Sequence, residues 1–334
     1  MESAGECGKK KVPCKNYYFT IEDKVMAAGE AADEERAEGS DPYQSSSYKP
    51  DLFFSGEVHG DEMVGPLAVI HTAELLLHAA SCARHYYATS TPDVGSSPHC
   101  KSWFGDHGYS EQDMRWLANL VSSRRIIMSP MSNALGFSNR ERREKRIDPN
   151  RDFAFDVKSP EQCMQTITAR HVNYIFRNHL ITAGITFHAG MTAIAYEWGA
   201  PSYNENGLVS PDNYAQRTLA KGLSDYGGTF KISKTETEKK YPYDQMNNNV
   251  YAVNGGMEDW SYAGSWSPHV VKDGCNPGTF GGYPREETVY NGATLRAVNL
   301  LVETSKAKKP YPGSLGNWEG IFDPKSPNNG HIPR

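Results

Sequence analysis

The chain has no run of 18 or more apolar residues, so no segment is expected to span a membrane. It also lacks a basic surplus, because 35 Lys and Arg stand against 40 Asp and Glu, for a net charge of -5. Without excess cations to neutralise a phosphate backbone, a nucleic-acid partner is disfavoured. The start, Met1–Lys15, is polar and does not resemble a signal peptide. A cytoplasmic protein and a secreted one with its signal removed both fit.

Cysteine pairs with the close spacing of metal sites are also absent. The six cysteines therefore allow either up to three disulfides or six free thiols, and the sequence leaves both open. No Asn-x-Ser/Thr sequon is present, which weakly favours a protein without N-glycans. Nothing in the sequence reports the oligomeric state. With 38% hydrophobic and 22% charged residues, 30 Gly and 20 Pro, the 334-residue composition is that of a loop-rich globular protein.

Short apolar runs alternate with helical patterns along the chain. This alternation predicts an α/β fold with a mixed, mostly parallel sheet and helices on both faces, a three-layer α/β/α sandwich. In such folds the chemistry lies in loops beyond the strand ends. The expected strands are Asp51–Ser55, Arg125–Ser129, Ile181–Phe187 and Leu295–Val302, and the expected helices are Met63–Ala80, Ser159–Leu180 and Asp212–Tyr226.

A metal-binding pattern begins directly after the first strand. The segment Phe54-Ser-Gly-Glu-Val-His59-Gly-Asp-Glu62 places a His and a Glu three residues apart at a strand-to-helix junction. Imidazole and carboxylate are zinc ligands, and a catalytic zinc needs three protein ligands. His188 supplies the third, because it ends another predicted strand and small residues follow it. The alternatives are a surface turn for the first pair and a core histidine for His188.

A candidate anion clamp follows the charged run Arg140–Arg146. In the segment Asp148-Pro-Asn150-Arg151, the guanidinium can grip a carboxylate bidentately while the neighbouring amide holds the second oxygen. The charged run itself is typical of a solvated helix. The Pro-stiffened segment after it suits a fixed site better.

These motifs resemble the zinc carboxypeptidase family, which includes carboxypeptidases A and B. The resemblance implies that His59, Glu62 and His188 bind one zinc ion. By the same resemblance, Asn150 and Arg151 would bind the terminal carboxylate of a peptide. Peptide or protein C-termini are therefore the expected substrates.

Further members of the site follow from the same resemblance. Asp148 matches the acid that orients the first ligand His and fixes its tautomer. The segment Tyr251-Ala-Val-Asn-Gly-Gly-Met-Glu258-Asp-Trp260 matches the family's lid tyrosine in register, so Tyr251 is expected to bond the substrate near its C-terminus. Glu258 falls where the family has the floor of its side-chain pocket. An acid there suggests a preference for C-terminal Lys or Arg, unless a neighbour neutralises it or it turns outward.

The catalytic acid/base of the family stands at the end of a late strand. Leu300-Leu-Val-Glu303-Thr-Ser-Lys-Ala-Lys-Lys-Pro310 resembles the Glu-x-Ser-x-x-Lys-x-Pro form of one branch, which makes Glu303 the expected general base. The family also has an upstream Arg that polarises the scissile carbonyl. Its usual spacing falls on Glu141, and Arg142 is preferred over its neighbours Arg140 and Arg143. Loss of such a donor would cost on the order of 3 kcal/mol of transition-state stabilisation.

The resemblance runs from about residue 50 to 310, and the expected organisation follows it. Residues 1–48 are predicted to be an N-terminal arm with marginal structure, residues 49–310 the catalytic domain, and residues 311–334 an extension or a truncated linker. The expected function is a zinc-dependent metallocarboxypeptidase. The alternatives are a zinc-dependent amidase or esterase acting on small acylated amino acids, and a peptide-binding homologue without catalytic activity.

Overall fold

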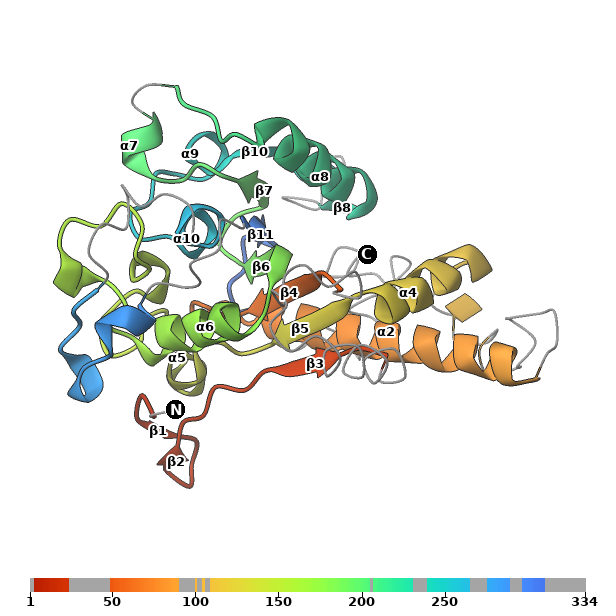
Figure 1. The fold of residues 1–334 in the computed structure, drawn as a ribbon, viewed down its shortest axis with the longest axis horizontal. Coiled ribbons are helices and arrows are strands. Elements are labelled where there is room, and N and C mark those ends of the chain that lie inside the picture. The colour runs from red at the N-terminus through yellow and green to blue at the C-terminus, as the bar shows by residue number, and fades with distance from the viewer. Residues whose placement is uncertain are drawn as a thin grey trace, which may run out of the picture.

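A mixed seven-stranded sheet forms the centre of the molecule (Figure 1). The computed structural model describes residues 3–23, 49–89, 100, 104–105, 109–204, 207–230, 239–264, 275–288 and 296–309. The strands of the sheet are β3 (Phe19–Ile21), β4 (Asp51–Gly56), β5 (Arg125–Ser129), β6 (Ile181–His188), β7 (Ala193–Tyr196), β10 (Tyr243–Gln245) and β11 (Val298–Glu303). Two small hairpins add β1 (Glu6–Cys7) with β2 (Val12–Pro13), and β8 (Thr229–Phe230) with β9 (Lys239–Lys240).

The strand order is β10-β7-β11-β6-β4-β5-β3. The neighbours β5, β4, β6 and β11 run parallel, as do β10 and β7. Only the β11–β7 and β3–β5 pairings of this sheet are antiparallel. The predicted mixed, mostly parallel sheet is therefore confirmed.

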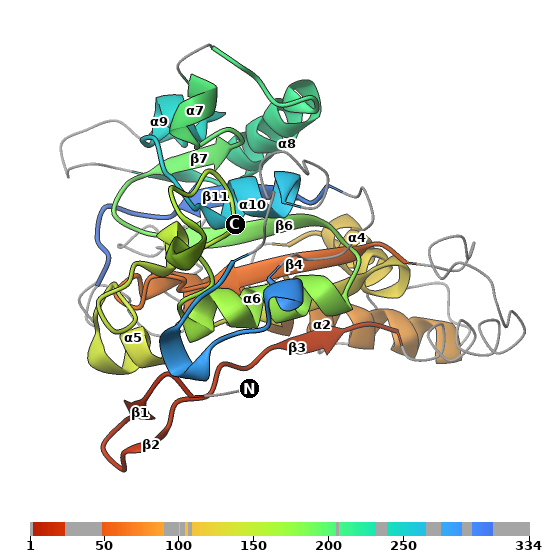
Figure 2. The same ribbon diagram turned by 60° about the vertical axis from the view of Figure 1, so that its left-hand side comes forward.

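Helices cover both faces of the sheet. Figure 2 shows α6 and α10 on the near side, with α2, α4 and α8 on the far side. The predicted three-layer sandwich is confirmed by this arrangement. The helices are α2 (Val64–Thr89), α4 (Glu111–Ser123), α5 (Ala134–Asn139), α6 (Ile167–Asn178), α7 (Pro201–Asn204), α8 (Asn213–Tyr226), α9 (Met246–Asn249) and α10 (Met257–Ala263).

Alternating strand side chains fill the two cores. In β5, Ile126 and Met128 pack into the cluster that holds Val69 of α2, while Ile127 packs into the opposite cluster with Phe176 of α6. A strand buried on both faces cannot show a polar side, which is why β4 and β5 read as plain apolar runs in the sequence. Both strands were predicted to within one residue.

Part of the N-terminal segment, for which the sequence suggested only marginal structure, belongs to the sheet. β3 pairs antiparallel with β5, and Ile21 is buried against the α2 side of the core. Glu22 accepts a hydrogen bond from Arg125 at 3.0 Å and anchors the end of the strand. An edge strand of three residues has too little alternation to detect in a sequence. The rest of the N-terminal arm, residues 24–48, which includes an Ala/Glu-rich stretch at 27–39, and the predicted extension at 311–334 lie outside the described residues.

The helix expected over Ser159–Leu180 is shorter than predicted. Only a 3-10 turn, Pro160–Gln162, forms at the expected start, and α6 begins at Ile167. Two buried carboxylates fix this start: Asp152 accepts the Thr166 N–H at 2.7 Å, and Glu144 accepts the Ile167 N–H at 2.7 Å. Anionic acceptors at a helix N-terminus satisfy its free N–H groups. The start of α6 is therefore set by these two residues, which are distant in sequence, and not by the segment Ser159-Pro-Glu, which by itself predicts an earlier start.

Other predicted elements are confirmed, although α2 continues to Thr89, nine residues beyond the expected end at Ala80. α2 and α8 cover the expected helices, and β11 begins at Val298, three residues after the predicted start. By length and composition, Val64–Cys82 of α2 is apolar enough to cross a membrane. In the structure this stretch packs against β4 and α4, as a core helix does.

All six cysteines pair, which resolves the choice that the sequence left open. Cys7–Cys14 closes the β1–β2 hairpin, and Cys82–Cys100 lies beside α4. Cys163–Cys275 joins positions 112 residues apart. A cross-link that closes a loop of this length stabilises the fold by about 4 to 5 kcal/mol in the chain-entropy account.

A buried histidine makes folding stability depend on pH. Burial lowers the pKa of His171 to about 4, and its Nε2 lies 3.0 Å from the Ser129 hydroxyl. The unfolded chain, with the ordinary pKa of 6.5, therefore binds a proton at a higher pH than the folded chain does.

The stabilisation that His171 contributes should be complete above pH 6.5 and fall by about 1.4 kcal/mol per unit as the pH drops toward 4. Urea unfolding of the wild type and of His171→Gln across this range tests the prediction. The wild type should lose stability on acidification by roughly 2.5 kcal/mol more than the variant between pH 6.5 and 4.5. A pH-independent difference between the two proteins would contradict it.

Candidate metal centre and carboxylate-binding residues

Three neighbouring parallel strands bring the predicted site together. His59 and Glu62 follow the carboxyl end of β4, His188 ends β6, and Glu303 ends β11. Glu303 is paired directly with His188 in the parallel register of β11 and β6. Because β4, β6 and β11 are adjacent, residues up to 244 positions apart meet at one edge of the sheet (303 - 59 = 244).

His59, Glu62 and His188 converge on one point. A ligand atom from each lies within 4.8 Å of the other two, and all three residues are buried. His59 Nδ1 lies 3.0 Å from Glu62 Oε1, and His188 Nδ1 lies 2.9 Å from Glu62 Oε2. The two Nδ1 atoms are 3.1 Å apart. The sequence-predicted ligand set is therefore assembled in the folded chain.

The outer nitrogens of both histidines face carboxylates. His59 Nε2 lies 3.0 Å from Asp148 Oδ1, and His188 Nε2 lies 3.5 Å from Glu258 Oε1. A carboxylate at Nε2 favours the proton on that nitrogen and leaves the Nδ1 lone pair free. Both lone pairs can then point at the same ion. This donor set, two neutral imidazoles and one carboxylate, fits a single zinc ion with an open fourth position.

The field at this point favours a cation. Burial lowers the pKa of His188, but hydrogen bonds and charge from Glu258 and Glu62 outweigh it and raise the pKa to about 10. Burial would raise the pKa of Glu62, yet His59 and His188 hold it well below its usual range. The negative charges of two buried residues, Glu62 and Glu258, thus favour a cation at the position that the ligand atoms surround.

Of the three candidate arginines, Arg142 reaches the metal centre. Its Nε donates to Asp148 Oδ2 at 2.9 Å, and its Nη1 donates to Glu62 Oε1 at 3.3 Å. Burial lowers the pKa of Arg142, but Asp148 and Glu62 raise it overall. Arg140 instead lines a separate pocket, and Arg143 is exposed. Arg140 holds a left-handed φ of 57° after α5, which re-aims the chain two residues before Arg142.

Lys308 is a residue of the site to which the sequence gave no role. Its Nζ donates to Glu62 Oε1 at 2.8 Å and lies 3.7 Å from Asp61 Oδ1. It is the lysine of the Glu-x-Ser-x-x-Lys-x-Pro pattern, so a signal was present, but a pattern gives no direction for a side chain. Lys308 lies close to Gly190, where an added Cβ would stand 3.0 Å from its Cε.

Glu303 is nearly buried at the end of β11. Its Oε2 accepts the Met191 N–H at 3.3 Å. Burial is the main reason why its pKa is raised, and Glu62 adds to this shift while His188 opposes it. A carboxylate with a raised pKa is a stronger base, as proton abstraction requires.

Asn150, Arg151 and Tyr251 lie together beside this centre. Arg151 Nη2 is 3.4 Å from the Tyr251 hydroxyl, and Tyr251 is 46% exposed. Asn150 is buried, with its Oδ1 accepting the Met257 N–H at 2.7 Å. Asp148 accepts the Asn150 N–H at 3.1 Å, which ties this group to the metal centre. The exposed ends of Arg151 and Tyr251 are thus placed where an anion can reach them.

Glu258 does not lie free at the floor of a side-chain pocket. Its side chain is fully buried, with Oε2 accepting from Asn150 Nδ2 at 3.3 Å and Oε1 near His188. Burial would raise its pKa, but His188 and Asn150 lower it overall. These contacts join the metal centre to the candidate clamp.

Comparison with known proteins identifies the class. Residues 20–271 match the zinc carboxypeptidase family. The chain belongs to this family, whose members use one zinc ion, and the His59, Glu62 and His188 cluster is the site that could bind it. A comparison with curated proteins finds no match.

Several solved structures are similar in fold. Carboxypeptidase A from Helicoverpa armigera is 12% identical with a TM-score of 0.47, covering 91% of this chain and 58% of that one. Thrombin-activatable fibrinolysis inhibitor is 15% identical with a TM-score of 0.43, covering 77% and 56%. The cell shape determinant protein Csd4 from Helicobacter pylori is 11% identical with a TM-score of 0.40, covering 92% and 52%. The chain thus spans just over half the length of each.

The contact from Asp148 to His59 predicts a loss of zinc affinity in Asp148→Asn. An amide cannot hold the Nε2 proton as a carboxylate does, so zinc affinity should fall by roughly 10- to 100-fold. Competition with a chromophoric chelator measures this. Asp156→Asn, which changes a carboxylate bonded to Ser202, is the matched control and should keep wild-type affinity. Equal affinities for the two variants would contradict the role of Asp148.

Proposed function

We propose that this protein is a metallocarboxypeptidase that removes the last residue of peptides or proteins. The observation that carries the proposal is the pairing of Glu303 with His188 in adjacent parallel strands. This register sets a candidate general base beside the metal ligands. The Arg151 and Tyr251 pair nearby offers a binding point for a free carboxylate.

A bound zinc ion would supply Lewis-acid chemistry, polarising the scissile carbonyl and lowering the pKa of water towards roughly 7. In the proposed reaction, Glu303 takes the proton of the attacking water and later donates it to the leaving amine. Arg142, held by Asp148 and Glu62, donates hydrogen bonds to the carbonyl oxygen as negative charge develops there. Asp148 keeps His59 oriented throughout.

The clamp makes the proposed enzyme an exopeptidase. Arg151 can hold a terminal carboxylate bidentately, and the Tyr251 hydroxyl lies within reach of the same group. Asn150 is fixed by Met257 and Glu258, so it offers a rigid amide beside the guanidinium. An amidated C-terminus would leave these donors without an anion, and its hydrolysis is therefore disfavoured.

Two other functions use the same centre. An amidase or esterase acting on small acylated amino acids would share the metal ligands and Glu303, but it would not need a clamp for a peptide's C-terminus. A non-catalytic peptide-binding homologue would keep the clamp and would not need Glu303. The presence of both groups in one site favours the carboxypeptidase.

The preference for Lys or Arg is the finer part of the proposal. It requires Glu258 to meet the substrate side chain, whereas its carboxylate is buried against His188 and Asn150. These contacts favour a positioning role, in which Glu258 fixes the two residues that bracket the site. A preference for C-terminal Lys or Arg then depends on whether the ammonium or guanidinium of the substrate side chain can replace Asn150 Nδ2 as the donor to Glu258.

The test incubates the zinc-loaded protein with peptides that end in Lys, Arg, Phe or Leu, each with a free or an amidated C-terminus. Single C-terminal residues should be released from the free peptides only. Glu303→Gln should lower kcat/KM by roughly 10²- to 10⁴-fold, because the general base is lost. Glu161→Gln, an exposed change on the 3-10 turn at 160–162, is the matched control and should keep wild-type activity.

Each other outcome identifies another function. Cleavage of amidated and free peptides at the same rate would exclude a role for the clamp in binding the terminal carboxylate. Cleavage of acylated amino acids, without cleavage of peptides, would favour the amidase or esterase. Peptide binding without any release would favour the non-catalytic homologue. Release of Lys and Arg alone would support the Glu258 pocket, and release of Phe and Leu would discard that pocket but keep the enzyme.

A further inference from the structure

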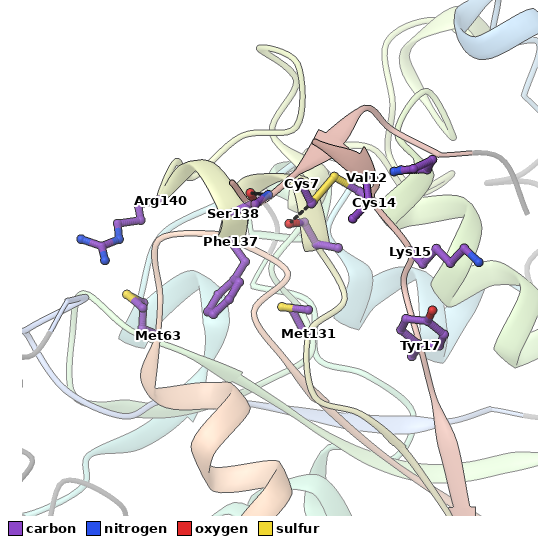
Figure 3. A pocket seen from close by; sticks show the side chains of 13 residues that line it. Cys7, Val12, Cys14, Lys15, Tyr17, Met63, Met131, Phe137, Ser138 and Arg140 are labelled. Carbon is purple, nitrogen blue, oxygen red and sulfur yellow. Dashed lines mark hydrogen bonds between the residues drawn. A yellow bond between two sulfur atoms is a disulfide. The ribbon is translucent and has the colours of Figure 1, made fainter. Parts of the chain in front are cut away.

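A second concave site lies next to the metal centre and has no part in the reaction proposed above. It is a pocket of about 790 Å³ between the β1–β2 hairpin, α5 and the residues that follow Glu62 (Figure 3). In this view Phe137 lies between Met63 and Met131, while Arg140 and Lys15 stand at opposite sides and extend outward. Its lining residues include both of these cations and no acid.

The fold builds this pocket from an anchored hairpin. The Cys7–Cys14 disulfide closes the hairpin, and Cys14 packs in a buried cluster with Leu135 of α5. The Gly8 N–H donates to Ser138 Oγ at 2.8 Å, and Asn16 Nδ2 donates to the Ser132 carbonyl at 2.8 Å. The wall is therefore fixed to the catalytic domain at several points.

Two residues that line the pocket, Met63 and Arg140, contact the segment that carries Lys308. Met63 follows the ligand Glu62 directly, and its N–H donates to the Lys308 carbonyl at 2.9 Å. Lys309 Nζ donates to the Arg140 carbonyl at 2.6 Å. The segment that carries Lys308 and Lys309 therefore contacts residues of both sites.

The pocket and the carboxylate clamp are connected to the metal ligands through different residues. Contacts lead from Met63 to Glu62, from Glu62 through Arg142 to Asp148, and from Asp148 to Asn150 of the clamp. In an exopeptidase the terminal carboxylate is held at the clamp and the scissile bond lies at the metal. The rest of the peptide must therefore extend from the metal in a direction away from the clamp.

We infer that this pocket binds a large apolar side chain of the substrate upstream of the cleaved bond, in a peptide that also carries acidic residues there. The inference rests on the proposed carboxypeptidase function. Two methionines and a phenylalanine form an adaptable apolar floor, since methionine adjusts its shape to different side chains. Lys15 and Arg140 complement acids that flank the apolar residue, and the exposed Lys9–Lys11 of the hairpin add to the positive field.

The experiment measures binding to the full-length, zinc-loaded Glu303→Gln protein by fluorescence anisotropy. The probes are N-terminally labelled Gly/Ser peptides with a free C-terminus, in which one Phe with a neighbouring Glu is moved along the upstream positions. One position should bind about tenfold more tightly than the plain Gly/Ser peptide, as the burial of an aromatic side chain provides. Added salt should reduce the part of this gain that comes from the Glu.

Tyr17→Ser and Met131→Ser should each remove most of the tenfold gain. Tyr17 is 66% exposed, so the first variant tests the pocket without disturbing a core. The matched control is Leu219→Ser on α8, where an apolar side chain that is 48% exposed lies outside the pocket lining, and this variant should keep the gain. The proposal is overturned if affinity does not depend on the Phe position, or if the pocket variants and the control behave alike.

Failure of the pocket and failure of the proposed function give different results. Hydrolysis of all the peptides by the wild type at one rate, without a preferred Phe position, would reject the pocket and keep the carboxypeptidase. A preferred Phe position in binding, without release of any residue by the wild type, would keep the pocket and reject the carboxypeptidase.

Discussion

The buried carboxylate of Glu62 is the interaction on which the rest of the site depends. A carboxylate that is 1% exposed is costly unless other groups compensate its charge. Here both oxygens are surrounded: Oε1 by His59, Arg142 and Lys308, and Oε2 by His188 and the Ala189 N–H. The segments that supply these groups come from four distant parts of the chain. Their positions relative to one another are therefore set by the need to compensate one charge.

The sheet makes this convergence possible. β4, β6 and β11 are neighbours and run parallel, so the groups at their carboxyl ends share one edge without any special arrangement of the loops. Two other buried acids, Asp152 and Glu144, accept hydrogen bonds from the N-terminus of α6 and fix the start of that helix. The same physical rule thus operates at the metal centre and in the scaffold beneath it. At both places a buried carboxylate accepts hydrogen bonds from segments distant in sequence.

The positions of the metal ligands and of Glu303 could be expected from the sequence, because each lies at or shortly after the end of a strand and belongs to a motif that resembles the family. Residues whose role depends on side-chain direction could not be placed in this way. The spacing of the charged run left Arg140, Arg142 and Arg143 as close competitors, and of the three it is Arg142 whose contacts with Asp148 and Glu62 place it at the metal centre. Lys308 belonged to a recognised pattern, yet only the fold shows that its ammonium reaches Glu62. Glu258 was expected at an open pocket floor, whereas it is buried against His188 and Asn150.

The strands and helices of the fold were likewise predicted only in part. Long apolar strands such as β4 and β5 were found because burial on both faces leaves an unbroken apolar run. The short edge strand β3 and the start of α6 were missed, because both are fixed by partners that lie far away in sequence. The N-terminal hairpin is the clearest case, since its disulfide and its contacts with α5 give it a defined place that its polar sequence does not suggest.

The central claim is that two imidazoles and one carboxylate hold a single zinc ion. X-ray absorption spectroscopy at the zinc edge of the fully loaded protein tests it most directly, because it reports ligand types and distances without relying on activity. The account predicts one zinc per chain, with nitrogen and oxygen ligands at roughly 2.0 to 2.2 Å, two of them imidazoles, and no sulfur. Zinc–sulfur distances near 2.3 Å, or the same spectrum in the His188→Ala variant, would contradict it.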